Sequence, residues 1–227
     1  MTATSTNERL RGKEHMSVTG GFWIVGVVPD VDVARVRRAF PGYAPVGQSA
    51  DQSPDCLDWW RGRSPVETFF EPASHGLRPT DDARRLQDCI DAMRPADDQT
   101  EEIKDELMGL VPQQEGAGLF CAAARKGDPT AALGYALGPE RMSQLPSWCG
   151  DFLIDAAEVR AVLPAAEAVL ALSQQQRRAV VDRIGDWMTG MADAPDHDAD
   201  ELIDGPLRVL RHAAQQGLGA VGLTRWY

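Results

Sequence analysis

His75 is the residue in this sequence whose type and position could most readily do chemistry. It lies in the segment EPASHG, which follows an aromatic cluster, and loops of this kind often carry functional side chains. An imidazole becomes a general base when the fold brings it close to a carboxylate or a thiol, here Asp58, Cys121 or Cys149. A lone loop histidine is more often simply exposed, so we predict no catalytic residue. A hydrolase with an unrecognised His/Asp site is the alternative.

The run Asp196–Glu201 (DHDADE) has carboxylates at alternate positions that could bind a hard cation. A calcium loop needs glycine at its sixth position and a bidentate glutamate at its twelfth, and Glu201 and Leu207 stand there instead. The histidines show no HExxH or HxH spacing, and no phosphate-binding glycine motif is present. We therefore expect no metal and no cofactor, and we interpret these acids as partners of the dipole of the following helix.

The most promising binding surface is the pair Trp59-Trp60 followed by Arg61, because Trp and Arg dominate interaction hot spots. Adjacent residues point in different directions, so the alternative is one tryptophan in the core and the other at its rim. Trp59, Trp60, Arg61 and His75 are the candidate binding residues.

The net charge of −11 is concentrated in two segments. Residues 81–106 hold ten acids and four bases, and residues 193–204 hold six acids and no base. Such a surface repels phosphate backbones, so we expect no nucleic-acid partner. Charge runs mostly mark solvated helix faces. If these acids serve recognition, they favour a basic protein partner.

The four cysteines are too widely spaced for a CxxC pair or a zinc knuckle. The N-terminus lacks the apolar core of a signal peptide, and no stretch approaches the ~18 apolar residues of a membrane span. We therefore expect a cytoplasmic protein with no membrane contact. Its thiols would stay reduced and pack as small buried hydrophobes.

Apolar periodicity predicts the elements of the first half. Residues 1–17 are expected to form a disordered tail, 22–28 a buried strand and 31–40 a short helix. Residues 41–56 are interpreted as a loop, and 61–79 fit either a helix or a strand. Thr80 opens a helix that ends at Pro95, and a second helix follows with Ile103 and Leu107 facing inward.

In the second half, residues 119–124 and 131–137 are parted by KGDP and predict a β-hairpin. Residues 151–154 predict a strand that leads into a helix capped by Asp155, with Pro164 inside it to kink or split it; Ser173 caps the next helix. The last helix is expected to start at Pro206 and to stop at Gly217, before a closing strand at 220–223. The order indicates an α+β fold with helices packed on a small mixed sheet, as a single domain over residues 18–227.

Several of these pieces together resemble the YfbM-like family, a bacterial group of domains of unknown function. They are residues 16–40 (the first strand and helix), the cluster Leu57-Asp58-Trp59-Trp60, the strand and capped helix of 152–159, and the last helix and strand of 200–223. The resemblance covers roughly residues 16–227 and implies a compact α+β fold, with no reaction and no catalytic residue. The N-terminal tail, the second tryptophan of the pair and Gly205-Pro206 depart from the family pattern.

These observations favour a non-enzymatic, acidic interaction protein of an immunity-like or regulatory kind. The sequence leaves open the identity of the partner and the oligomeric state.

Overall fold

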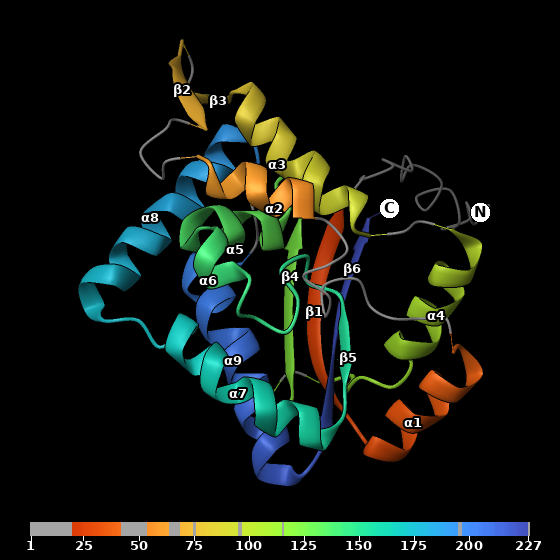
Figure 1. Cartoon of the computed structure of the whole chain (residues 1–227). Helices are drawn as coiled ribbons and strands as arrows, with labels where there is room; N and C mark the ends of the chain where they lie inside the picture. The colour runs from red at the N-terminus through yellow and green to blue at the C-terminus, as the bar shows by residue number, and fades with distance from the viewer. Residues whose placement is uncertain are drawn as a thin grey trace, which may run out of the picture.

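The computed structural model describes residues 20–41, 54–63, 69–74, 76–94, 97–114, 116–194 and 197–226 of the 227-residue chain. A four-stranded sheet in the order β4-β1-β6-β5 forms its centre (Figure 1), and a hairpin of β2 and β3 forms a second sheet. The strands are β1 (Gly21–Val28), β2 (Phe70–Ala73), β3 (Gly76–Pro79), β4 (Leu119–Ala124), β5 (Phe152–Ile154) and β6 (Gly219–Trp226). All described pairs are antiparallel, so the α+β class is confirmed, but the sheet is not mixed.

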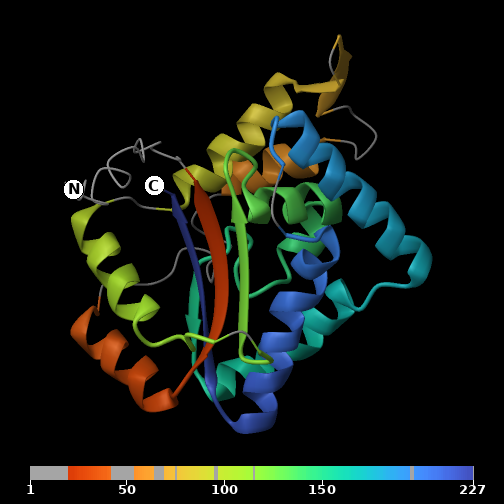
Figure 2. The ribbon, with the colours of Figure 1, turned by 180° about the vertical axis from the view of Figure 1, so that it is seen from behind.

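Helices cover both faces of the large sheet. They are α1 (Asp30–Ala39), α2 (Pro54–Arg61), α3 (Asp81–Ala92), α4 (Asp98–Met108), α5 (Pro129–Leu137), α6 (Pro139–Met142), α7 (Ala156–Leu170), α8 (Gln174–Gly190) and α9 (Ala199–Gln216). Helices α1 and α4 lie on one face, and α5, α7 and α9 lie on the other (Figures 1 and 2). Within the part of the chain that the structure describes, no helix has the length and apolar character needed to cross a bilayer.

The central strands β1 and β6 pair along their whole length, from Gly21 opposite Trp226 to Val28 opposite Gly219. Strand β1 is the apolar run predicted from the sequence, and almost all of its residues are buried. Because the strands are antiparallel, the start of β1 and the end of β6 lie side by side at one end of the sheet. A pocket lined by the last residues of β6 lies at this end of the sheet.

The predicted hairpin over 119–137 is wrong in its second half. Residues 119–124 form β4, but residues 129–137 form helix α5. Asp128 caps this helix by accepting hydrogen bonds from the backbone N–H groups of Thr130 and Ala131, and Pro129 occupies the first turn. The helix is buried almost all round, so its sequence is apolar throughout and lacks the 3.6-residue alternation that marks a surface helix.

Helix α9 begins at Ala199, seven residues before the predicted start at Pro206. Asp198 caps it, and Gly205-Pro206 lie buried inside it. A Cβ atom on Gly205 would lie 2.0 Å from Cδ2 of Phe120, so the glycine lets β4 and α9 approach closely. The two predicted capping boxes, at Asp155 and Ser173, are confirmed, and α7 stays one helix through Pro164.

A disulfide joins Cys56 of α2 to Cys89 of α3, with their Cα atoms 5.8 Å apart. The expectation of four reduced, buried thiols is therefore wrong for this pair. Cys149 is a buried thiol outside the disulfide, as expected, whereas Cys121 is exposed. The bridged residues lie 33 positions apart, a spacing typical of no redox or metal motif, so only the packing of α2 on α3 reveals the bridge.

Candidate functional site

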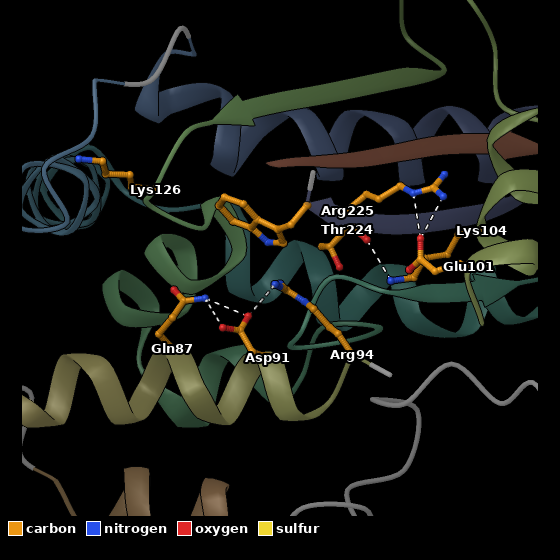
Figure 3. A pocket seen from close by; sticks show the side chains of 9 residues that line it. Gln87, Asp91, Arg94, Glu101, Lys104, Lys126, Thr224 and Arg225 are labelled. Carbon is orange, nitrogen blue, oxygen red and sulfur yellow. Dashed lines mark hydrogen bonds and ion pairs between the residues drawn. The ribbon is translucent and has the colours of Figure 1, made fainter. Parts of the chain in front are cut away.

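A pocket of about 470 Å³ lies between α3, α4 and the last residues of β6 (Figure 3). Gln87 and Asp91 of α3 and Arg94 just beyond it form one wall, because spacings of four and three residues place side chains on one side of a helix. The figure shows these three side chains pointing from α3 towards the sheet. The remaining lining residues are Glu101 and Lys104 of α4, Lys126 of the β4–α5 loop, and Thr224, Arg225 and Trp226 of β6.

Arg94 is the buried residue of this wall. Its Nε and Nη2 atoms donate to the carbonyl oxygen of Cys149 at 2.8 and 2.6 Å, and its guanidinium also pairs with Asp128 and Thr130. Burial alone would raise the pKa of Asp128, but the adjacent Arg94 outweighs it and holds that pKa below its usual value. Both groups therefore stay charged at neutral pH, as a closed ion pair.

A second buried ion pair joins Lys104 of α4 to Asp151. The Nζ atom of Lys104 lies 3.1 Å from Oδ2 of Asp151 and donates to the carbonyl oxygen of Thr224 at 3.0 Å. The other carboxylate oxygen of Asp151 accepts from the backbone N–H and the hydroxyl of Thr224, both at 2.6 Å. These two side chains provide hydrogen-bond partners for the backbone of Thr224, which lies beyond the part of β6 that pairs with β5.

The lining of the pocket as a whole has more cationic than anionic side chains, but most of the cations are buried. The side chains of Arg94, Lys104 and Arg225 are only 6, 5 and 15% exposed, and carboxylates already hold all three. The side chains of Asp91 and Glu101 are 51 and 38% exposed. Trp226 is 39% exposed, and Lys126 is an exposed cation at the rim. A ligand entering the pocket therefore meets two carboxylates that each already have one cationic neighbour, Arg94 for Asp91 and Arg225 for Glu101, together with one indole and one ammonium group.

Asp91 is the more exposed of the two acids of the pocket; its carboxylate oxygens accept from Nε2 of Gln87 at 3.0 and 3.1 Å, and one of them lies 3.6 Å from Nη1 of Arg94. Partial burial raises its pKa, and the nearby carboxylates of Asp128 and Asp88 add to that effect, while Gln87 and Arg94 oppose it. A cation that approaches such a carboxylate stabilises its charged form, so the free energy of the pair falls. The arrangement suits the binding of a positive group.

The rim loop that carries Lys126 is held by Asp193. One carboxylate oxygen of Asp193 accepts hydrogen bonds from three consecutive backbone N–H groups, those of Arg125, Lys126 and Gly127, at 2.9, 2.6 and 2.7 Å. Burial alone would raise the pKa of Asp193, but these donors outweigh it and lower the pKa. The anchor connects the segment after α8 to one edge of the pocket.

The residues proposed from sequence lie elsewhere. Trp60 is buried, 3% exposed, and packs against Trp148, whereas Trp59 lies at the rim with the guanidinium of Arg85 4.6 Å from its ring centroid. Trp60 thus lies in the core, and Trp59 is partly buried and packs at its edge, an arrangement that matches the alternative to a joint binding surface. Arg61 is exposed and pairs with Asp58 and Glu140. His75 lies outside the described residues.

A second pocket, of about 490 Å³, lies between β4 and the start of α9 and contains Cys121, His197 and Glu201. The Nδ1 atom of His197 lies 2.9 Å from the carbonyl oxygen of Ala123, so the histidine bonds to backbone rather than to a carboxylate. Glu201 pairs with Arg208. In the described parts of the chain, no group of three or more His, Cys, Asp or Glu residues is placed to hold a metal ion.

Sequence reasoning missed the α3–α4–β6 pocket. Its acids belong to the charged run 81–106, which the sequence presents as a solvated surface. The one available signal was the polar series Gln87, Asp91 and Arg94 beside the apolar stripe of the same helix. That signal does not reveal which charges are later buried and paired.

Comparison with models of protein families, with curated proteins and with solved structures finds no match to this chain. The resemblance to the YfbM-like family therefore stays a prediction.

Proposed function

We propose that the protein is a non-enzymatic binding protein whose α3–α4–β6 pocket receives a basic side chain of a protein partner. The observation that supports this is the contrast in exposure within the pocket. Its interior cations are covered and neutralised, while its accessible groups are mainly the indole of Trp226 and the carboxylates of Asp91 and Glu101, which stay half exposed although they pair with Arg94 and Arg225. Carboxylates and a tryptophan face are the groups that bind ammonium and guanidinium ions in proteins.

The pocket supports this proposal better than the acidic segments do, because it groups two partly exposed acids and an indole around one cavity. In the segment 193–204, the described acids are engaged within the protein. Asp193 anchors the rim loop, Asp198 caps α9, and Asp200 and Asp204 both pair with Arg177. The net charge of −11 still attracts a basic partner over long range, but the pocket supplies the contact. The same net charge disfavours a nucleic-acid partner.

The disulfide affects the expected location of the protein. Disulfides persist in oxidising compartments and are rare in the cytoplasm, where thiols are kept reduced. The Cys56–Cys89 bridge therefore favours an oxidising compartment over the cytoplasmic location expected from sequence. In an oxidising compartment, the bridge would hold α2 on α3, the helix that forms one wall of the pocket.

A titration with a capped Gly-Gly-Arg-Gly-Gly peptide, followed by ¹⁵N–¹H NMR, tests the proposed function. A Gln-for-Arg peptide is the neutral probe. Asp91→Asn should weaken binding of the Arg peptide about fivefold, the value of an accessible ion pair of about 1 kcal/mol. Asp88→Asn is the matched control, because Asp88 is an exposed acid one turn earlier on α3 and does not line the pocket.

Equal weakening by the two substitutions would show that only net charge attracts the peptide. Equal binding of the Arg and Gln peptides would exclude recognition of a cation. Because the pKa of Asp91 is raised, its carboxylate should become protonated at a higher pH than an ordinary carboxyl group. Binding should therefore begin to weaken on acidification before the pH reaches the range in which carboxyl groups usually titrate. Asp91→Asn should remove that part of the pH dependence.

A further inference from the structure

Strand β6 is longer than its neighbour on the side of the pocket. Strand β5 pairs only with residues 220–222 of β6, whereas β6 continues to Trp226. Beyond Phe152, no described strand lies on that side of β6. Gly150 and Asp151, which precede β5, still lie beside Thr224, so the sheet edge next to the pocket is at the end of β6, and Figure 3 shows α3 facing this part of the strand.

The backbone direction at this edge follows from Thr224. Its N–H donates to Asp151 and its carbonyl accepts from Lys104, so both groups point away from β1. In an antiparallel ladder, the backbone groups of residues two apart point to the same side. The N–H and C=O of Trp226 therefore point to the same edge as those of Thr224.

The backbone groups on this edge of β6 have hydrogen-bond partners at Thr224, and the strand continues beyond that residue to Trp226. Asp151 and Lys104 supply an acceptor and a donor to Thr224, as the backbone of a neighbouring strand would. At the next position along this edge the backbone belongs to Trp226, which also lines the pocket. An added strand can form its hydrogen bonds there while a side chain reaches the acids.

We propose that the partner presents its basic residue from an extended segment that adds to the edge of β6 at Trp226. This inference rests on the proposed function. It specifies a peptide strand because strand addition joins backbone hydrogen bonds to side-chain pockets. A helix has its own backbone groups occupied and would use only the acids, as a free amine would.

N-methylated versions of the capped Gly-Gly-Arg-Gly-Gly peptide test the inference, because each methyl group removes one backbone donor and leaves the charge unchanged. Methylation at one interior amide should weaken binding about fivefold or more, the effect of losing one hydrogen bond of about 1 kcal/mol. Methylation of the C-terminal amide nitrogen is the control and should have little effect. The amide proton of Trp226 should shift downfield and exchange more slowly when the parent peptide binds.

The outcomes separate the two proposals. If Asp91→Asn weakens binding but every methylated peptide binds like the parent, the pocket binds a cation and the strand addition is overturned. Slow exchange of the Trp226 amide in the protein alone would show an edge that is already paired, which also overturns it. If the Arg peptide does not bind at all, the proposed function fails and the strand addition fails with it.

Discussion

Removal of the Cys56–Cys89 disulfide should destabilise the fold by an amount that its position predicts. The bridge joins residues 33 apart, and cross-linking a loop of this length lowers the entropy of the unfolded chain. The loop relation gives about 3.7 kcal/mol for the lost stability near room temperature. That figure is a large part of the 5–15 kcal/mol that typically stabilises a folded protein.

The assay is urea unfolding of the wild type and of Cys56→Ser/Cys89→Ser, each with and without a phosphine reductant. With a slope of roughly 2 kcal/mol per molar urea, the midpoint of the double variant should fall by about 2 M. Reductant should lower the wild type to nearly the same midpoint and leave the double variant unchanged. Cys121→Ser is the control, because Cys121 is exposed and takes no part in the disulfide.

A thiol count on unreduced protein completes the test. Alkylation followed by mass measurement should label Cys121 and Cys149 in the unfolded chain and leave the bridged pair unlabelled. Four labelled thiols, or equal midpoints for wild type and double variant without reductant, would refute both the cross-link and the argument for an oxidising compartment.

Three further predictions concern the supports of the fold. Arg94→Met should destabilise the protein by about 3–5 kcal/mol in urea unfolding, because it leaves the buried Asp128 charge unpaired, and Arg94→Met/Asp128→Asn, which removes that charge but keeps an acceptor oxygen at the cap of α5, should recover part of that loss; a double variant worse than the single would refute this. Asp193→Asn should cost about 1–2 kcal/mol at pH 7, because it weakens three hydrogen bonds to a charged acceptor. Because the pKa of Asp193 is lowered in the folded protein, its contribution to stability is present above the unfolded-state pKa of about 3.9 and is lost as the pH falls through the folded-state pKa. The stabilities of wild type and variant should therefore converge in acid. A stability difference that stays constant with pH would count against the anchor. Gly205→Ala should lower thermal stability through the contact with Phe120, whereas Gly185→Ala, with nothing within 4 Å of its Cβ position, should raise stability by up to about 1 kcal/mol; similar shifts for both would contradict the packing argument.

The sequence by itself determined the features that depend on neighbouring residues. The apolar run of β1 forms a strand because its β-branched and aromatic side chains favour an extended backbone. The boxes at Asp155 and Ser173 set helix starts through hydrogen bonds that span three residues. Gly217 ends α9 in the left-handed conformation that glycine adopts without a steric penalty. These patterns were sufficient for most elements and for the α+β class.

Tertiary burial overrode local signals at α5 and α9. Residues 131–137 were predicted as a strand because a helix buried on all sides carries no polar face. Pro206 marked a plausible helix start, but Asp198 provides an earlier cap and Phe120 packs against the helix at Gly205. In both places the deciding contacts come from residues distant in sequence.

Only the tertiary structure decided the disulfide and the site. Cys56 and Cys89 meet because α2 packs on α3. Arg94 and Lys104 look like surface cations in the sequence, yet the fold buries them against Asp128 and Asp151. Which charges remain available to a partner depends on which are desolvated and paired, and side chains far apart in sequence determine that pairing.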